Sequence, residues 1–588
     1  MKQAEQEKPN NKRQGRLLKY SLQSKGTLGQ GLLVSVLSVA SGLLAPYLVK
    51  YLLDNELKEG VSLSINFFVL ILAAYLGATL LSAIMRYLSY LLMQKAANEI
   101  SMQMQLDVFS HVQKLPIEFF DQLPAGQVVS RITNDTKAVK LLYQVVLSQF
   151  MMAGIYALGI YISLTFIDPM LLLIALIPVP LLFFLFRDFR SKSALYNRIM
   201  RRKLSELNGN LNENIQGMEV ISSLGKESQI YLEFAVINDQ SYEQGRNMTK
   251  LFSYSAYNAT SVLQYLMLAA VLLYFGYGHL SGAYWVPIGT FYVFIDYMLN
   301  LFSQINNAMT RVGDLERSRS AADHIFEILD LETVTNGCES APEASGRIAF
   351  ENVTFAYKDE DVLKDISFEV KPDQTVAFVG QTGSGKSTIL NLLFGFYQPQ
   401  KGRILFEDEP LDNLDFKSFR RQMAIVLQDP FLFTGTILSN ITLNREEISR
   451  ADAETALREV GGDMLLDRLE LGLDTKVIEK GQGFSAGERQ LISFARALAH
   501  NPRILVLDEA TSSIDSETET AIQKALHRLE QGRTTLIIAH RLSTIKHADQ
   551  IIVLDHGRIA EQGVHANLIA QNGIYKSMYE AQSQENLS

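Results

Sequence analysis

One stretch of the chain has the residue types and spacing of a phosphate-binding loop. An apolar run predicted as a strand, Thr375 to Val379, leads into the pattern G-x-x-x-x-G-K-[ST], and a run predicted as a helix, Ile389 to Leu393, follows it. Glycines let backbone N–H groups close around phosphate oxygens, and the helix directs its positive end at the anion. The loop consists of Gly380, Gln381, Thr382, Gly383, Ser384, Gly385, Lys386, Ser387 and Thr388.

Two side chains of this loop have predicted tasks of their own. Lys386 would reach the β and γ phosphates, and Ser387 would place its hydroxyl on Mg²⁺. A glycine- and serine-rich turn without a ligand is the simpler alternative. The strand before the loop and the helix after it disfavour that alternative, because a phosphate loop needs both. The sequence therefore predicts a site for a nucleoside triphosphate.

Length and composition indicate what surrounds this site. A chain of 588 residues is too long for one hydrophobic core, so we expect two or more domains. The net charge of −9 does not favour a nucleic-acid partner. The single cysteine, Cys338, excludes an internal disulfide and most cysteine-based metal sites. Long apolar runs dominate the first half, whereas the second half has the composition of a soluble α/β domain.

Six segments of the first half are long and apolar enough to span a bilayer. Buried helices of a soluble protein are the alternative, which is hard to sustain for six such segments. The sequence therefore predicts a multi-pass membrane protein with the lipid bilayer as a partner. The predicted spans are approximately 28–53, 66–93, 141–166, 169–186, 252–278 and 285–305.

Charges in the connections predict the orientation of these spans. The N-terminal tail is polar and basic, and it lacks the cleavage pattern of a signal peptide. The long second and fourth connections are basic and should be cytoplasmic, and six spans return the nucleotide-binding half to that same side. The basic residues of these two connections are Arg86, Lys95, Lys114, Arg131, Arg187, Arg190, Lys192, Arg198, Arg201, Arg202 and Lys203.

The two long connections read as continuations of the membrane helices. Helical spacing of apolar residues persists through Ile100 to Leu115 and through Leu204 to Ile221. Each connection has a predicted break, at Leu115 to Asp121 in one and at Asn208 to Asn214 in the other. A short helix that touches another domain and a plain turn are both compatible with these breaks.

Asp296 is a polar residue near the middle of the sixth predicted span. An acid at that depth costs about 2.5–3.5 kcal/mol on insertion scales, so its side chain should face a cavity or a partner rather than lipid. We hypothesise that Asp296 lines a transport pathway and favours cationic substrates. Structural pairing with a neighbouring helix is the alternative.

The second half carries further motifs in a recognisable order. A charged helix predicted over Arg311 to Leu331 and a polar linker ending at Ser345 lead to a strand that begins at Arg347. The motifs that follow resemble an ABC transporter ATPase, and with the six spans the whole chain resembles a half-transporter of the exporter type. The implied fold is an all-α six-helix membrane domain followed by an α/β P-loop ATPase domain. The implied parts are an N-terminal tail (1–27), the membrane domain (28–310), a connecting helix and linker (311–346) and the nucleotide-binding domain (347–588).

The resemblance assigns roles to six residues outside the phosphate loop. Tyr357 matches the aromatic residue that stacks on adenine, a contact that does not exclude GTP. Asp508 would hold Mg²⁺ through water, and Glu509 would polarise the attacking water as general base. Gln428 would contact Mg²⁺ and the attacking water, Asp515 would close the loop that crosses to the opposite site, and His540 would contact the γ-phosphate.

The family signature Leu-Ser-Gly-Gly-Gln is altered here to Phe484-Ser-Ala-Gly-Glu. In dimers of this family the segment caps the nucleotide of the other subunit. Ser485 and Gly487 are kept, but Ala486 adds a Cβ where backbone approaches phosphate, and Glu488 brings a negative charge near an anion. Both changes should weaken that composite site.

An altered signature beside otherwise intact ATPase motifs resembles one chain of a heterodimeric exporter. We therefore expect a second half-transporter as partner, with one hydrolytic and one degenerate site, and a homodimer with a tolerated variant is the alternative. The segments Gly435 to Ile441 and Thr475 to Gly481 also resemble exporter segments, which favours export over import.

The predicted function is an ATP- and Mg²⁺-dependent export pump subunit in a bacterial plasma membrane. Its substrates should be hydrophobic or amphipathic compounds of the multidrug type, moved by alternating access. A lipid flippase and a peptide exporter are alternatives within this class. A regulatory subunit that uses its ATPase as a switch is the alternative outside it, and the intact Glu509 and His540 argue against it.

Overall fold

The computed structural model describes residues 8–56, 65–281, 287–334, 337, 339–508, 524–538 and 545–585. The chain divides into two compact units. A helical unit comprises residues 1–115 and 123–332, and an α/β unit comprises residues 116–122 and 333–588. The short segment 116–122 thus interrupts the helical unit in sequence but belongs to the α/β unit.

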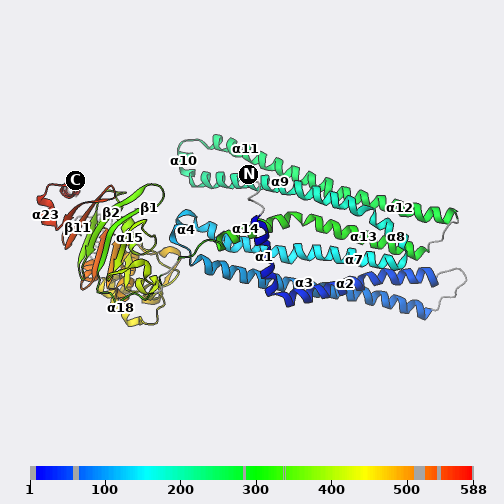
Figure 1. Cartoon of the computed structure of the whole chain (residues 1–588), viewed down its shortest axis with the longest axis horizontal. Helices are drawn as coiled ribbons and strands as arrows, with labels where there is room; N and C mark the ends of the chain where they lie inside the picture. The colour runs from blue at the N-terminus through cyan, green and yellow to red at the C-terminus, as the bar shows by residue number, and fades with distance from the viewer. Residues whose placement is uncertain are drawn as a thin grey trace. The chain divides into compact units, whose positions relative to one another are not determined.

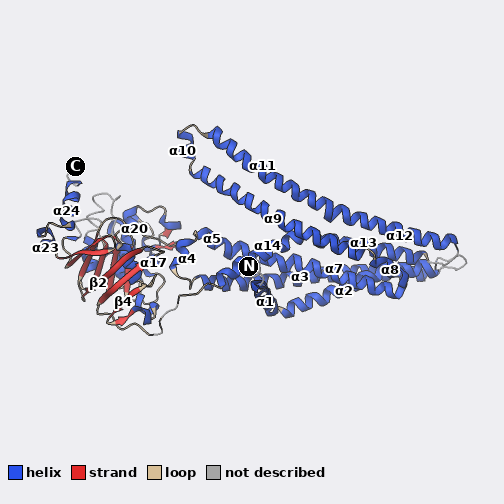
Figure 2. Ribbon diagram, turned by 45° about the horizontal axis from the view of Figure 1, so that its top comes forward, coloured by secondary structure: helices blue, strands red, loops and turns tan. Residues whose placement is uncertain are grey.

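Long helices that run side by side form the helical unit (Figures 1 and 2). The main helices are α1 (Lys8–Gln23), α2 (Lys25–Tyr51), α3 (Ile65–Val112), α7 (Ser148–Ile167), α8 (Pro169–Leu176), α9 (Pro178–Gln216), α11 (Glu227–Leu251), α12 (Ala259–Ser281), α13 (Ile288–Thr310) and α14 (Val312–Leu329). The shorter helices are α5 (Ala125–Ser130), α6 (Thr136–Leu141) and α10 (Met218–Ser223), and wider π-helical turns occupy Leu52–Glu56, Arg131–Asp135, Leu142–Leu147 and Phe252–Asn258.

Five helical segments in the described residues are long and apolar enough to cross a membrane. They are Lys25–Asp54, Ile65–Val112, Ala125–Ile167, Pro169–Gln216 and Glu227–Gly278. They cover the first five predicted spans. The sixth predicted span lies largely in α13, which is helical but does not belong to these five. A polar row on α13, Asp296, Asn300 and Gln304, lowers its apolarity, while its opposite face packs in the core of the unit.

The predicted helical continuations are confirmed, and one predicted break is wrong. α3 runs unbroken to Val112, and the first predicted break is the short helix α4 (Ile117–Gln122). The second predicted break, Asn208 to Asn214, lies inside α9, where the Asn214 side-chain amide donates to Asn210 Oδ1 at 2.9 Å. Asparagines one turn apart pair along the helix instead of ending it. The turn comes later, around α10, where Gly225 has a φ of +61°.

Small and polar side chains hold the helices of this unit together. Ser38 Oγ donates to the Ser82 carbonyl and Ser82 Oγ donates to the Ser38 carbonyl, so α2 and α3 pack closely. Asp54 is buried and accepts a bond of 2.7 Å from the Gly289 N–H, which satisfies a donor at the start of α13. These contacts fix α13 beside α2, with its polar row on one side.

The described residues of the α/β unit form three sheets, and β1, β2 and β11 are labelled in Figure 1. A four-stranded antiparallel sheet has the order β2-β1-β4-β5, a six-stranded sheet has the order β12-β11-β3-β10-β9-β6, and β7 pairs with β8. In the six-stranded sheet only β12 runs antiparallel to its neighbour. The strands are β1 (Ile348–Ala356), β2 (Asp361–Val370), β3 (Thr375–Val379), β4 (Lys401–Phe406), β5 (Glu409–Pro410), β6 (Met423–Val426), β7 (Gly435–Thr436), β8 (Lys476–Val477), β9 (Ile504–Asp508), β10 (Thr534–Ile538), β11 (Gln550–Asp555) and β12 (Arg558–Gly563).

Both faces of the six-stranded sheet are buried, which explains the apolar run before the phosphate loop. Val376 and Phe378 of β3 join one hydrophobic core, and Ala377 and Val379 join another on the opposite face. The helices of the unit are α15 (Lys386–Leu393), α16 (Phe416–Arg420), α17 (Ile437–Thr442), α18 (Arg450–Glu459), α19 (Asp463–Arg468), α20 (Ala486–Ala499), α23 (His565–Ala570) and α24 (Ile574–Glu585).

Candidate functional site

The phosphate loop connects the end of β3 to the start of α15. Gly385 is the N-cap of α15 with a φ of +104°, and no side chain of the described residues caps this helix. Its first backbone donors therefore stay available to a ligand, because they have no partner within the helix. The loop thus presents a helix N-terminus at the carboxyl edge of the parallel strands, where ligands of open α/β sheets bind.

Two positions of the loop need glycine for two reasons: the backbone conformation and the lack of space for a Cβ atom. A Cβ on Gly380 would lie 2.3 Å from the Leu554 carbonyl oxygen, and a Cβ on Gly385 would lie 2.5 Å from Leu363 Cδ2. A side chain at either position would push the loop away from the sheet. The glycine spacing in the motif therefore reflects the close approach of the loop to β11 and β2.

Lys386 is buried and points back into the loop. Its Nζ donates to the Gly380 carbonyl at 2.7 Å and to the Gln381 carbonyl at 3.0 Å. Burial lowers the pKa of Lys386, and the negative charge of Asp508 opposes that shift. An ammonium held by neutral carbonyls in a buried loop is well placed to gain an anionic partner.

A buried hydroxyl without a hydrogen-bond partner in the described part of the chain indicates that this loop suits a phosphate. Ser384 Oγ is buried and has no hydrogen-bond partner among the described residues. Leaving a buried hydroxyl unpaired costs about 1–3 kcal/mol, so the site gains by accepting a ligand oxygen there. Ser387, the predicted Mg²⁺ ligand, is exposed on the first turn of α15. The residues present fit a triphosphate.

Tyr357 lies beside the loop with an exposed ring. Its hydroxyl accepts from Asn391 Nδ2 at 3.0 Å and lies 3.4 Å from Thr388 Oγ1, so both contacts tie it to α15. The ring is 41% exposed and packs edge-on against Phe355 and Tyr397. This arrangement leaves part of an aromatic side chain exposed next to the phosphate loop, where a base could stack.

The helix α4 contacts this aromatic cluster within the α/β unit. The Tyr397 hydroxyl donates to an Asp121 carboxylate oxygen, and burial together with Asp121 raises the pKa of Tyr397. The first predicted break is therefore a short helix that touches another domain, one of the two possibilities that the sequence left open. Sequence patterns could not identify Tyr397, because its partner lies 276 positions away.

Two more predicted site residues lie at the same carboxyl edge. Asp508 ends β9, and Gln428 follows β6, the strand that pairs with β9 through Val426 and Leu507. Gln428 is exposed. Glu509, Asp515 and His540 lie outside the described residues.

The altered signature forms the start of α20. Ser485 is its N-cap: Ser485 Oγ accepts from the Glu488 N–H at 3.2 Å, and the Ser485 N–H donates to Glu488 Oε2 at 2.8 Å. The other oxygen of Glu488 lies 2.5 Å from Arg468 Nη2. Ala486 is exposed at the first helical position, and Gly487 is buried. Arg468, at the end of α19, is a contact that no sequence motif indicated.

The two segments that resemble exporters come together in the structure. Gly435 pairs with Val477 and Thr436 with Lys476, so β7 and β8 form a small antiparallel ribbon.

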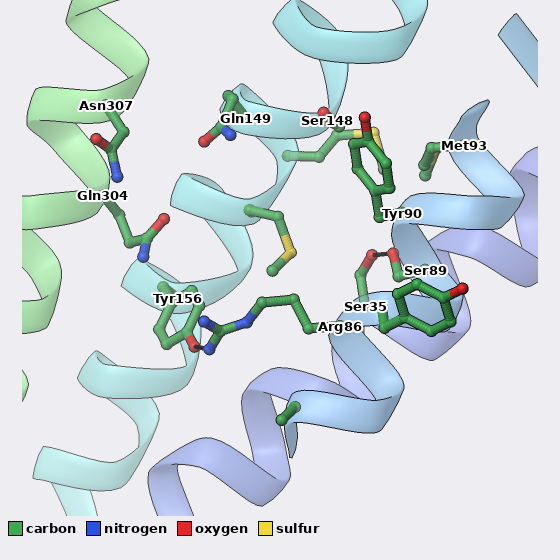
Figure 3. Close-up of a pocket in the computed structure, with 14 residues that line it drawn as sticks. Ser35, Arg86, Ser89, Tyr90, Met93, Ser148, Gln149, Tyr156, Gln304 and Asn307 are labelled. Atoms are coloured by element: carbon green, nitrogen blue, oxygen red, sulfur yellow. Dashed lines mark hydrogen bonds between the residues drawn. The ribbon is translucent and has the colours of Figure 1, made fainter. Parts of the chain in front are cut away.

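In the helical unit, Asp296 is half-buried and accepts from Asn300 Nδ2 at 3.0 Å. A cavity of about 540 Å³ lies between α2, α3, α7 and α13 (Figure 3). Asp296 is not among its lining residues in the described part of the chain.

Comparisons with known proteins match both units. The family model for the ABC transporter transmembrane region matches residues 28–305, and the ABC transporter family model matches residues 363–512. The chain is 44% identical to a probable multidrug resistance ABC transporter ATP-binding/permease protein of Bacillus subtilis, over 91% of this chain and 80% of that protein. It is 31% identical to an ATP-dependent lipid A-core flippase of Haemophilus ducreyi, over 92% of each chain.

A solved structure shows the same architecture. A bacterial Atm1-family ABC exporter with ATP bound matches 95% of this chain and 99% of its own, with a TM-score of 0.82 and 26% sequence identity. The motifs, the loop geometry and the two family matches agree on a membrane-embedded ATPase that couples ATP hydrolysis to transport. The chain belongs to the ABC transporter family, as an exporter with fused transmembrane and ATPase domains.

Proposed function

We propose that the chain moves hydrophobic or amphipathic compounds out of the cytoplasm or the inner leaflet by alternating access. The observation that carries this proposal is the cavity between α2, α3, α7 and α13, in the same chain as the phosphate loop. Methionines and tyrosines line much of the cavity, and such side chains adapt to ligands of varied shape. The multidrug name of the Bacillus subtilis relative supports the same substrate class.

A lipid flippase is the second candidate within this function. Relatives in Haemophilus ducreyi and Legionella pneumophila carry the name lipid A-core flippase. A flippase needs a cavity with polar groups at one level and apolar groups at another, and the present cavity has both kinds of lining.

We assign ATP to the phosphate loop and Tyr357, and Mg²⁺ to Ser387, Gln428 and Asp508. Bound Mg²⁺ would supply charge stabilisation for the transferred phosphoryl group. Lys386 would hold the β and γ phosphates, and Glu509 would orient the attacking water. The carboxyl edge that carries the loop, Gln428 and Asp508 supports this assignment.

The chain works as a dimer, and we propose a heterodimer. Dimers are the working form of ABC exporters in the bilayer. Ala486 and Glu488 depart from the signature that caps the nucleotide of the opposite subunit, so a site built on this segment should turn over slowly. The partner would then carry the intact signature and complete the site on Lys386 and Glu509.

One contact favours a homodimer instead. Arg468 is paired with Glu488, and only 16% of the Glu488 side chain is exposed. The positive charge of Arg468 offsets much of the repulsion that Glu488 would exert on a phosphate. If the charge is neutralised in this way, the added Cβ of Ala486 is the main remaining difference from an active signature.

Hydrolysis by the chain alone separates these two assemblies. We would measure Mg²⁺-ATP hydrolysis of the purified chain in lipid beside its Glu509→Gln variant. Turnover that disappears in the variant would establish an active homodimer. Low turnover that a second half-transporter restores, again dependent on Glu509, would establish the heterodimer. Flux of a labelled amphiphile into inside-out vesicles tests the pump itself, since a regulatory subunit would hydrolyse ATP without flux.

The charges of the connections support a bacterial plasma membrane orientation with the N-terminus and ATPase domain in the cytoplasm. Accessibility of single cysteines introduced at Lys226 and Ile65, in a variant whose native Cys338 is replaced by serine, tests this orientation. An impermeant thiol reagent applied to intact cells should label the second position and not the first.

A further inference from the structure

Among the described residues, the cavity of the helical unit has one charged lining residue, and it is a cation. Arg86 reaches from α3 across the cavity to Tyr156 on α7, with its Nη2 donating to the Tyr156 hydroxyl at 3.0 Å (Figure 3). The other lining residues are neutral. The charge pattern of the sequence predicts that Arg86 belongs to a basic cytoplasmic connection, whereas the structure places its guanidinium in the cavity.

The guanidinium of Arg86 has N–H donors that remain available for a ligand. No carboxylate of the described residues lies within salt-bridge distance of Arg86, and its one hydrogen bond among them is to a neutral hydroxyl. Arginine carries five N–H donors, so most of them remain for another acceptor. A cation in a membrane segment is costly and points to a functional site when it faces a cavity rather than lipid.

Polar and apolar side chains are interleaved along the wall of the cavity. Arg86 is about 32 Å along the helix axis from Ile65, at ~1.5 Å per residue, which is about one hydrocarbon thickness from the start of α3. Figure 3 shows Tyr156 beside Arg86, whereas Gln149 and Asn307 lie toward the other end of the cavity. Met151, Met152 and Tyr87 provide apolar surface. The lining therefore offers a cation for a headgroup and, beside it, apolar surface for an alkyl chain.

We propose that this cavity selects anionic amphiphiles, with Arg86 binding a carboxylate or phosphate headgroup. The proposal rests on the export function proposed above and names its substrate class. It opposes the preference for cations that Asp296 suggested, because Asp296 does not line this cavity. Asp296 also lies about 12 Å before Gln304 along α13, at ~1.5 Å per residue.

Binding of two matched probes tests the proposal. Each probe is a dodecyl chain with a terminal fluorophore, and the headgroup is either phosphate or trimethylammonium. Affinities are measured without ATP, on the full chain in phosphatidylcholine nanodiscs, with empty nanodiscs subtracted. We expect the phosphate probe to bind about tenfold more tightly, and Arg86→Gln to abolish that preference. Arg86→Lys should keep part of it.

Two control variants separate binding from structural support. Tyr156→Phe removes the hydrogen bond but keeps the charge, so the preference for the phosphate probe should survive. Asp296→Asn should also leave it unchanged. Equal weakening of both probes in Arg86→Gln would mean that Arg86 only braces α3 against α7, and tighter binding of the cationic probe would likewise overturn the proposal. Size-exclusion profiles and binding of a fluorescent ATP analogue confirm that each variant is folded.

A second arm identifies the source of the anion. Phosphatidylglycerol added to the nanodiscs should displace the phosphate probe from the unmodified chain, but not from Arg86→Gln, if the site accepts a lipid headgroup. An unchanged affinity would assign the site to free single-chain amphiphiles. Selective binding without flux into vesicles would leave this inference standing and overturn the export function, whereas flux without selective binding would overturn this inference alone.

Discussion

Two helices of the α/β unit begin where the proposed mechanism places phosphate, and they begin in different ways. α15 starts after Gly385 with no side-chain cap, next to the unpaired hydroxyl of Ser384. α20 starts at Ser485 with a complete capping box. The first helix leaves its donors for a ligand, whereas the second already satisfies two donors itself. The residues at the cap thus decide whether a helix N-terminus binds an anion or stabilises its own fold.

The charged residues at the two helix starts also favour ligand binding at α15 and helix stability at α20. Lys386 opens α15, where a cation opposes the helix dipole but attracts phosphate. Glu488 lies in the first turn of α20, where an anion favours the helix but repels phosphate. Binding therefore dominates at the first site and stability at the second, with Arg468 reducing the cost to binding.

The largest effect should come from the helix start that is open to ligand. Lys386→Ala should lower ATP hydrolysis of the active dimer by about 100-fold or more, because it removes a buried charge that contacts the reacting phosphates. Hydrolysis and binding of a fluorescent ATP analogue would be measured together. Lys401→Ala, an exposed lysine at the start of β4, is the matched control and should have no effect. Hydrolysis above a tenth of the starting rate would exclude this role for Lys386.

Sequence predicted the open helix start well because its determinants are local. The loop, the strand before it and the helix after it follow one another within 19 residues, from Thr375 to Leu393. The apolar spans and their helical continuations were equally readable, since composition and period are local properties. The resemblance to a known family added the roles of residues such as Gln428, which no local pattern explains.

What the sequence could not provide depends on contacts between distant residues. Arg468 approaches Glu488 from another helix, and Arg86 reaches Tyr156 across a cavity. The wrong break in α9 has a different cause, because paired asparagines are compatible with a helix that composition alone would end. Charge counting likewise placed Arg86 in a connection because it ignores the direction in which a side chain points.

A third helix provides a control for the role of Ser485, the serine of the capping box at α20. α18 begins with the same kind of box, formed by Ser449 and Asp452, away from the proposed site. Ser485→Ala and Ser449→Ala should each lower stability by about 1 kcal/mol. In a homodimer, where this segment completes a hydrolytic site, only Ser485→Ala should also lower hydrolysis. Thermal unfolding and ATPase rates of both variants decide this, and equal ATPase rates would mean that Ser485 acts as a cap alone.

The ion pair at α20 should have a smaller effect. In a homodimer, Arg468→Ala exposes the charge of Glu488 to the nucleotide of a hydrolytic site, so hydrolysis should fall about two- to fivefold. Glu488→Gln should raise hydrolysis, and the double variant should match Glu488→Gln, because Arg468 acts only through that charge. A double-mutant cycle on the ATPase rate measures the coupling. Additive effects would show that Arg468 influences hydrolysis by another route.

The smallest predicted effect is on the pH dependence of stability. It concerns the carboxylate of Asp452 in the capping box of α18. Hydrogen bonds from the Ser449 hydroxyl and backbone N–H lower the pKa of Asp452 below its ordinary value. A carboxyl group whose pKa is lowered by folding adds stability above the unfolded pKa of about 3.9, and that stability is lost as the pH falls through the lower, folded pKa. Asp452→Asn should therefore lower the unfolding temperature slightly at pH 7. The difference from the unmodified chain should shrink as the pH drops below about 4. If the difference in unfolding temperature were independent of pH, the Asn side chain of the variant would cap α18 less well for geometric reasons. The negative charge of Asp452 would then contribute nothing to stability.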